Sequence, residues 1–189
     1  MSEDFTIRPG RREDAAEAAR LWMQSAEEHT AHDRVYETAP GAEKVMRRFL
    51  ADVTNSGYSF LFVAAAGEQT VGFISGELRQ GSPTFLPKTW ASVDDVFVEP
   101  EYRNRGMGRA LLKSVQSWAQ ERGADGISLQ VAAANSRGRK FYEDLGFRDV
   151  SVYKVLESNR GRGYHLSGRS WSSIMGRERE RTRTPASGS

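Results

Sequence analysis

The chain has 189 residues, a length that suits one ordinary domain with a sizeable core and is short for two. It contains no cysteine, which excludes disulfide bonds, cysteine ligands for zinc and a thiol nucleophile. Residues 158–189 hold seven Arg against two Glu and so carry +5, which leaves 20 Lys and Arg against 23 Asp and Glu, or −3, in the remainder. The folded part therefore gives no support to nucleic-acid binding, despite the net charge of +2.

Neither a signal peptide nor a membrane span is predicted. The first eight residues, MSEDFTIR, lack the apolar core of a signal peptide. No apolar run approaches the ~20 residues that are needed to cross a bilayer. We therefore expect a cytoplasmic protein that does not contact the membrane.

The apolar pattern predicts strands alternating with helices. Apolar and β-branched stretches predict strands over residues 5–8, 59–66, 70–78, 91–98, 127–131 and 147–156. Apolar residues at helical spacing predict helices over residues 15–23, 45–53, 107–122 and 135–146. This order is β-α-α-β-β-β-α-β-α-β, and it indicates an α/β (α+β) domain.

The last part of the chain differs from the rest in composition. Ser, Gly and Arg dominate residues 158–189, and the apolar residues there are scattered. We expect residues 1–157 to form the domain and residues 158–189 to form a mobile basic tail. An alternative role for the tail is binding to nucleic acid or to an acidic partner.

A glycine-containing turn joins a predicted strand to a predicted helix. The strand ends near Val98, and the sequence Arg103-Asn104-Arg105-Gly106-Met107-Gly108 leads into the helix. A helix start presents unpaired backbone N–H groups and the positive end of the helix dipole. The turn is therefore a candidate anion site, which on this reasoning suits a nucleotide, a sulfate or a phosphorylated sugar equally.

Two motifs together resemble the GNAT superfamily (GCN5-related N-acetyltransferases). Arg103, Gly106 and Gly108 fill the superfamily's loop pattern, although Asn104 stands where the superfamily often has Gly. The segment Asn135–Phe147 resembles its Asn-to-Tyr helix that closes on Gly-Phe. The resemblance spans residues 5–156. It implies a mixed, mostly antiparallel central sheet of six or seven strands with about four helices.

The resemblance further implies acetyl-CoA as co-substrate. Backbone N–H groups of the glycine turn would bind the pyrophosphate, with charge-assisted contacts from Arg103 and Arg105. The pantetheine arm would lie beside the strand at Phe97 and Val98, where a splay from the strand at 127–131 would admit it. The residues assigned to coenzyme A are Phe97, Val98, Arg103, Asn104, Arg105, Gly106, Met107, Gly108 and Asn135.

Catalytic roles are assigned from the same resemblance and from strand geometry. Tyr142 matches the superfamily's general acid, which protonates the departing thiolate; its structural alternative is a packed aromatic beside Phe141. Asp94 and Asp95 are candidates for the base, but strand alternation directs them to opposite faces unless a bulge intervenes. Asn135 could cap its helix as well as bind the pantetheine arm.

Further acidic and basic groups are weaker candidates for the amine side of the site. Glu77, and Glu28 with His29, are additional groups for amine binding or for deprotonation through water. No set of histidines and acids has metal-ligand spacing, so no metal is expected.

The leading hypothesis is an N-acetyltransferase that acylates a primary amine of a small molecule or a protein. Its rival is a non-catalytic acyl-CoA-binding or interaction domain on the same fold. The early helices and the loop 79–90 are expected to select the acceptor, which the sequence does not identify. A homodimer is a further expectation to test.

Overall fold

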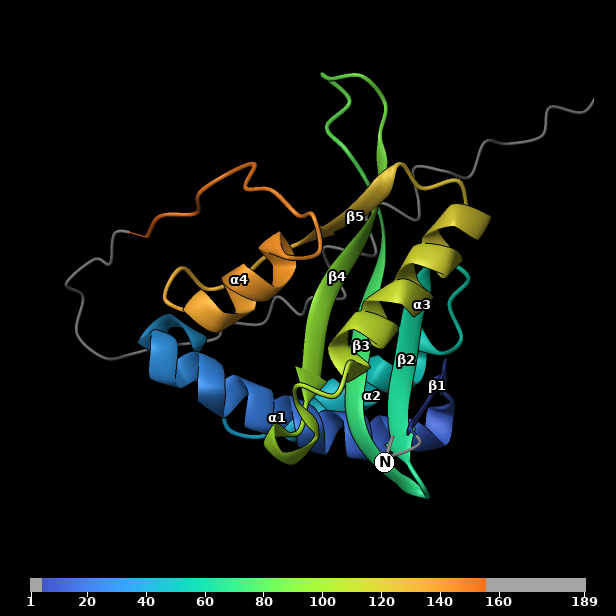
Figure 1. Ribbon diagram of the computed structural model, residues 1–189, viewed down its shortest axis with the longest axis vertical. Helices are drawn as coiled ribbons and strands as arrows, with labels where there is room; N and C mark the ends of the chain where they lie inside the picture. The colour runs from blue at the N-terminus through green and yellow to red at the C-terminus, as the bar shows by residue number, and fades with distance from the viewer. Residues whose placement is uncertain (1–4, 156–189) are drawn as a thin grey trace, which may run out of the picture. The chain divides into compact units, whose positions relative to one another are not determined.

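The computed structural model describes residues 5–155 as a five-stranded sheet in the order β1-β2-β3-β4-β5, with helices on both faces (Figure 1). The strands are β1 (Phe5–Pro9), β2 (Ser59–Ala66), β3 (Gln69–Gln80), β4 (Thr89–Val98) and β5 (Gly126–Leu129). The helices are α1 (Ala15–His32), α2 (Ala42–Val53), α3 (Met107–Glu121) and α4 (Ser136–Glu143). None of the helices in this described part is long and apolar enough to cross a membrane.

Strand pairing gives the mixed sheet that the sequence predicts. The pairs β1–β2, β2–β3 and β3–β4 are antiparallel, while β4 and β5 are parallel. A parallel pair needs a crossover connection, and α3 supplies it between β4 and β5. A short turn joins β2 to β3, the loop 81–88 joins β3 to β4, and the segment that contains α1 and α2 joins β1 to β2.

The two faces of the sheet carry separate hydrophobic cores because the helices divide between them. One core joins α1 and α2 to the sheet through Leu21, Leu50 and Phe73, none of which is exposed. The other joins α3 to the opposite face through Leu111 and Ile74, which are also fully buried. Burial of such side chains contributes roughly 1.5–3 kcal/mol each, so the helices on both faces stabilise the sheet.

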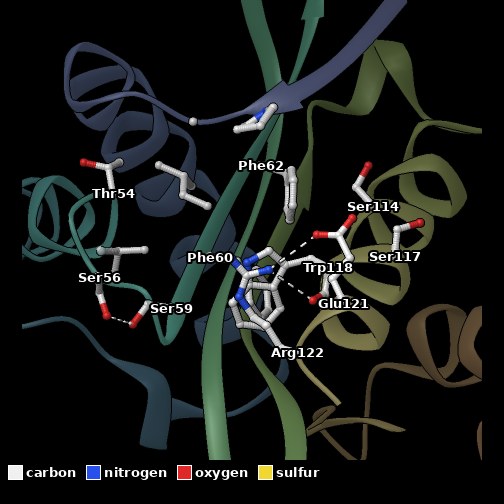
Figure 2. Close-up of a pocket in the computed structure, with 14 residues that line it drawn as sticks. Thr54, Ser56, Ser59, Phe60, Phe62, Ser114, Ser117, Trp118, Glu121 and Arg122 are labelled. Carbon is white, nitrogen blue, oxygen red and sulfur yellow. Dashed lines mark hydrogen bonds and ion pairs between the residues drawn. The ribbon is translucent and has the colours of Figure 1, made fainter. Parts of the chain in front are cut away.

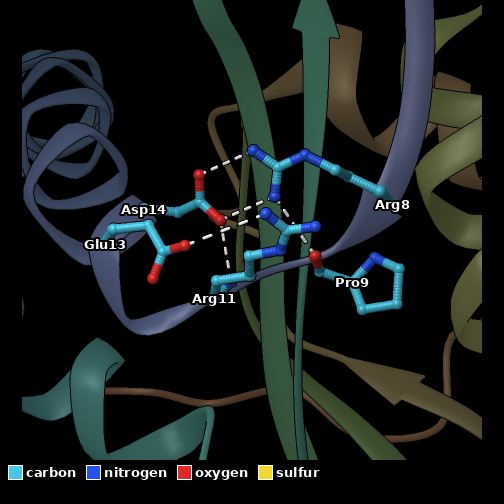
Figure 3. A network of polar contacts seen from close by, with 5 residues as sticks. All are labelled: Arg8, Pro9, Arg11, Glu13 and Asp14. Carbon is cyan, nitrogen blue, oxygen red and sulfur yellow. Dashed lines mark hydrogen bonds and ion pairs between the residues drawn. The ribbon is translucent and has the colours of Figure 1, made fainter.

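A partly buried ion pair fixes the junction between β1 and α1 (Figure 3). Both carboxylate oxygens of Asp14 accept hydrogen bonds of 2.7 Å from the Arg8 guanidinium. The backbone N–H of Arg11 donates to the same carboxylate at 2.7 Å. The bond from Arg8 holds the pKa of Asp14 below its ordinary value, so the pair remains charged at neutral pH.

The predicted number of strands is wrong for the described residues. Five strands are present where six or seven were expected, and residues 147–155 form no strand. The apolar pattern there has no partner strand, and Val150, Val152 and Tyr153 are 78–86% exposed. An isolated β-like pattern does not form a strand, because a strand needs a neighbour for its backbone groups.

The chain divides into two compact units, Met1–Arg148 and Asp149–Ser189. The first holds every helix and strand named above. The predicted tail at 158–189 lies outside the described residues, so its predicted mobility and its alternative binding role stay predictions.

Candidate functional site

The site residues predicted from the sequence gather around the C-terminal half of β4. This half runs from Asp94 to Val98 and leads through Arg103 into α3. On its β3 side the backbone is paired as far as Val98, which lies opposite Gly72. On its β5 side this half of the strand has no recorded backbone pairing among the described residues.

Pairing between β4 and β5 stops halfway along β4. The parallel register runs from Trp90 and Gly126 to Val93 and Leu129, where β5 ends. Beyond this point β5 slants away toward α4 while β4 continues toward the middle of α1 (Figure 1). The predicted splay between these strands is therefore present, and it leaves one edge of β4 without a strand partner in the described part of the chain.

The alternation of hydrogen-bonded residues between β3 and β4 identifies which backbone groups of β4 face this open edge. The N–H of Glu99 donates to the carbonyl of Val71 at 2.9 Å, so Glu99 points toward β3. Because backbone groups alternate along a strand, Phe97 also points toward β3, whereas Val96 and Val98 point toward the splay. The backbone groups of Val96, like those of Val98, thus face the open edge. The sequence analysis did not assign Val96, because the sequence does not show which residues of β4 form hydrogen bonds with β3.

The glycine turn enters α3 through residues with positive φ. Gly106 has φ +88° and precedes the first residue of α3. Asn104 has φ +63°, the only positive value at a non-glycine residue in the described part, in the place where it departs from the family pattern. The first bond within α3 runs from Ala110 N–H to the Gly106 carbonyl at 3.0 Å. The N–H groups before Ala110 belong to the helix start, which attracts anions.

Arg103 ties three elements together. Its Nε donates to the Val98 carbonyl at 2.7 Å, and its terminal nitrogen contacts Glu28 on α1 at 2.7 Å. Its guanidinium also lies over the Phe97 ring, 5.1 Å from the centroid. The side chain predicted to reach phosphate is therefore engaged in positioning the loop, and the carbonyl of Val98 is already an acceptor.

The start of α4 packs directly against the glycine turn. A Cβ on Gly108 would lie 3.2 Å from the Phe141 ring, so this glycine permits close packing of α3 on α4. The Arg137 guanidinium donates to Asn104 at 3.2 Å. The Asn135 side chain accepts from Gly138 N–H at 2.8 Å, which confirms its predicted capping role.

Tyr142 is half-buried on α4. Its ring makes edge contacts with Phe141 and Phe147, at centroid distances of 5.3 and 5.7 Å. Burial raises the pKa of Tyr142 to about 12, so the phenol keeps its proton at every working pH. No hydrogen bond of its hydroxyl is recorded within residues 5–155, and no side-chain polar atom in that range is buried without a partner. The hydroxyl is consequently open to a ligand.

A β-bulge interrupts the strand alternation that would direct Asp94 and Asp95 to opposite faces of the sheet. Ser75 lies opposite Asp95, and Gly76 lies opposite Val93, so Asp94 is the extra residue. A Cβ on Gly76 would lie 2.0 Å from the carbonyl oxygen of Ser92, so this position requires glycine. A glycine inside a strand is a known signal of a bulge, and Gly76 is the signal in this sequence.

The Asp94 carboxylate lies in a network of charged side chains. Arg79 contacts Asp94 at 2.8 Å and Glu77 at 3.0 Å. Desolvation raises the pKa of Asp94 to about 6; Arg79 opposes this rise, while Glu77 and Asp95 add to it. A carboxyl with this pKa is ionised at pH 7 and can accept a proton.

Asp95 faces α1 and is held by hydrogen bonds. The Trp22 indole N–H donates to one oxygen at 2.8 Å, and the Ser75 hydroxyl lies 3.4 Å from the other. Desolvation raises the pKa of Asp95, and these two bonds oppose the rise. Both oxygens of this carboxyl therefore have hydrogen-bond partners, whereas the Arg79 contact of Asp94 involves Oδ1 alone.

Glu28 and His29 occupy the end of α1, as predicted, but each already has a partner. Glu28 contacts Arg103, while His29 Nδ1 lies 2.7 Å from the Ser25 carbonyl. Glu77 contacts only Arg79 among the recorded ion pairs of residues 5–155. Among these weaker candidates, Glu77 is the one connected to Asp94, because Arg79 contacts both carboxylates.

Two pockets of about 480 and 490 Å³ lie away from this region. The first is bounded by α2, β2 and α3; in it the Arg122 guanidinium stacks on Trp118, 4.4 Å from the ring centroid (Figure 2). The second is lined mostly by charged side chains near Asp14 and Glu99. Size alone does not identify a functional site, and neither pocket contains Asp94, Tyr142 or the glycine turn.

Comparison with known proteins places this geometry in context. The model of the acetyltransferase (GNAT) family matches residues 17–147. An uncharacterized N-acetyltransferase, MJ1207 of Methanocaldococcus jannaschii, is 25% identical over 154 residues, which are 82% of this chain and 65% of that protein. The [ribosomal protein bS18]-alanine N-acetyltransferase of Escherichia coli K12 is 29% identical over 94 residues, covering 48% of this chain and 64% of that protein. The chain thus spans a little under two thirds of each relative.

A solved structure shares the fold. The tetramutant of the BH1408 protein from Bacillus halodurans superposes with a TM-score of 0.73 at 24% identity, covering 81% of this chain and 99% of that one. At this identity the likeness concerns the fold alone. Its coverage includes nearly all of the solved chain, so the described arrangement corresponds to a whole domain of that kind.

Proposed function

Because the chain belongs to the acetyltransferase (GNAT) family, we propose that it is an acetyl-CoA-dependent N-acetyltransferase that acylates a primary amine of a small molecule or a protein. One observation carries the proposal: the C-terminal half of β4 has an open edge that runs directly into the anion-attracting turn at the start of α3. A long thioester with a pyrophosphate in its arm fits this shape, because the edge offers backbone groups and the turn offers N–H groups.

The binding roles divide between backbone and side chains. The turn from Asn104 to Gly108 binds the pyrophosphate through its N–H groups, and Val96 pairs with the pantetheine arm. Arg103 holds the end of β4 through the Val98 carbonyl, so it shapes the cradle in addition to contributing positive charge. Arg105, which lies over the Tyr102 ring at 5.3 Å, adds a further charge beside the turn.

The proposed mechanism needs three proton transfers. Asp94 accepts a proton from the acceptor's ammonium group, directly or through water, and the neutral amine attacks the thioester carbon. The C–N bond forms and the C–S bond then breaks, while Tyr142 donates its phenolic proton to the departing sulfur. The proton lost by the new amide nitrogen restores the phenol. The net reaction converts an ammonium ion and acetyl-CoA into an amide, free CoA and one proton.

The direct test is a screen of primary amines with acetyl-CoA, read by release of the CoA thiol. The proposal predicts thiol release that depends on at least one amine and on enzyme concentration. The rival is a domain that binds acyl-CoA without turnover; it predicts that acetyl-CoA raises the melting temperature while no amine in a broad panel is acetylated.

A further inference from the structure

Resting on the proposed role of Asp94 as base, we propose that Arg79 and Glu77 are positioning residues that together set the orientation and protonation of Asp94. They thereby set the lower end of the pH range in which the enzyme acts. Neither residue is expected to touch the reacting atoms. Both act through the carboxylate at the β-bulge.

The geometry joins the three side chains across two strands. The Arg79 guanidinium bridges two carboxylates, with Nε at 3.0 Å from Glu77 and a terminal nitrogen at 2.8 Å from Asp94. The side chains of Glu77 and Asp94 are 21% and 23% exposed, although the Asp94 backbone at the bulge is open to solvent, while the Arg79 side chain is 50% exposed. The bridge is thus sheltered at its carboxylates and open to solvent at the guanidinium, where a substitution can be accommodated.

The contact with Arg79 leaves one oxygen of Asp94 available. The guanidinium binds Oδ1, and no contact of Oδ2 is recorded among the described residues. A carboxylate has acceptor sites on both oxygens, so Oδ2 can take the proton while Oδ1 stays anchored. The bulge sets the position of the Asp94 side chain, and the contact with Arg79 sets the orientation of its carboxylate.

The charges around Asp94 act in opposite directions. From β3, the Arg79 cation lowers the pKa of Asp94 and the Glu77 anion raises it. From β4, the neighbouring Asp95 also raises it. On α1, Trp22 is neutral, and His29 acts on Asp95 rather than on Asp94. Removing Arg79 and removing Glu77 must therefore shift the titration of Asp94 in opposite directions, which a purely structural role would not do.

The experiment is the pH dependence of kcat/KM for acetyl transfer, from pH 4.5 to 8, with an amine found in the thiol-release screen. Arg79→Gln is expected to move the acidic limb upward by roughly half a pH unit, and Glu77→Gln to move it downward by a similar amount. Arg79→Lys retains the charge and should leave the limb close to that of the wild type. Arg11→Gln and Glu13→Gln form a matched control, because this solvent-exposed pair, with its charged atoms 3.9 Å apart, lies just before α1 and away from Asp94.

The outcomes separate this inference from the proposed function. If Asp94→Asn abolishes the acidic limb and the two glutamine variants shift it in opposite directions, the inference holds. If Asp94→Asn abolishes the limb but the two variants leave it unmoved, or move it the same way, the inference is overturned and the base assignment survives. If Asp94→Asn retains the wild-type limb, the base assignment fails and this inference fails with it.

Discussion

The two ends of the C-terminal half of β4 place their polar groups by different means. At the Val98 end, the glycine turn offers backbone N–H groups whose positions depend on Gly106 at φ +88° and on packing of Gly108 against Phe141. At the Asp94 end, the polar groups are ionisable side chains held by ion pairs across two strands. Backbone conformation and side-chain packing thus determine the polar groups at the Val98 end, whereas ionisable side chains provide them at the Asp94 end.

This difference has a physical consequence for function. Backbone dipoles do not titrate, so the turn should bind a phosphate group with little dependence on pH between 5 and 9. A carboxyl with a pKa of about 6 changes its charge inside that range. Cofactor binding at one end and deprotonation of the amine at the other should therefore respond to different substitutions and different conditions.

The largest expected effect comes from Tyr142→Phe, which removes the proposed acid and keeps the ring. We expect kcat to fall about 10²- to 10³-fold, because the thiolate must then leave without a proton. Thiol release under saturating acetyl-CoA measures this. The matched control is Tyr153→Phe, since Tyr153 is 86% exposed; equal activity in both variants would rule out the acid role.

Asp94→Asn should produce the next largest effect. The amide cannot accept a proton, so kcat/KM at pH 7 is expected to fall roughly tenfold to a hundredfold. The proposed base Asp94 can act only when ionised, so wild-type activity should decline tenfold per pH unit below pH about 6. The variant should show a low, flat profile in that region. A variant profile that still declines below pH 6 would assign the limb to another group.

Gly106→Ala tests the turn without introducing a collision. A Cβ at this position meets nothing within 4 Å, but φ +88° is unfavourable for alanine. We expect the free energy of unfolding to fall by about 1 kcal/mol and acetyl-CoA to bind about fivefold more weakly, with an unchanged pH profile. Calorimetry and urea unfolding measure these changes. Gly57→Ala is the control, because Gly57 has an ordinary φ and open space around it.

Glu28→Gln should have the smallest effect. It removes the charge opposite Arg103, but the Glu28 side chain is 47% exposed, and exposed pairs contribute about 0–1 kcal/mol. The dissociation constant for acetyl-CoA should therefore change less than about threefold. The same titration with Glu27→Gln gives the background for loss of one negative charge on α1. A change of tenfold or more would show that the pair with Arg103 controls the turn.

The sequence predicts the turn end of β4 better than the bulge end. Gly106, Gly108 and the Asn135 cap are local features, because a turn or a cap depends on residues a few positions apart. The Arg103 contact with Glu28 joins residues 75 positions apart, and nothing local specifies it. The motif thus predicted the position of the turn, but it did not predict that Arg103 contacts Glu28.

The bulge end depended on pairing between strands, which the pattern of a single strand does not contain. Alternation alone separates Asp94 from Asp95, whereas the observed register makes Asp94 the extra residue. Gly76 on the partner strand carried the relevant signal. The expected strand over residues 147–156 failed for a related reason, since its apolar pattern has no neighbouring strand within the described residues.

We propose that the Val98 end of this half of β4 binds the cofactor, while the Asp94 end removes the proton from the amine. Calorimetric titration of acetyl-CoA into the Asp94→Asn protein tests it most directly, alongside the wild type at pH 7. The account predicts a dissociation constant within about twofold of the wild-type value, even though thiol release in the same protein is severely reduced. An affinity that falls in proportion to the loss of turnover would contradict the division.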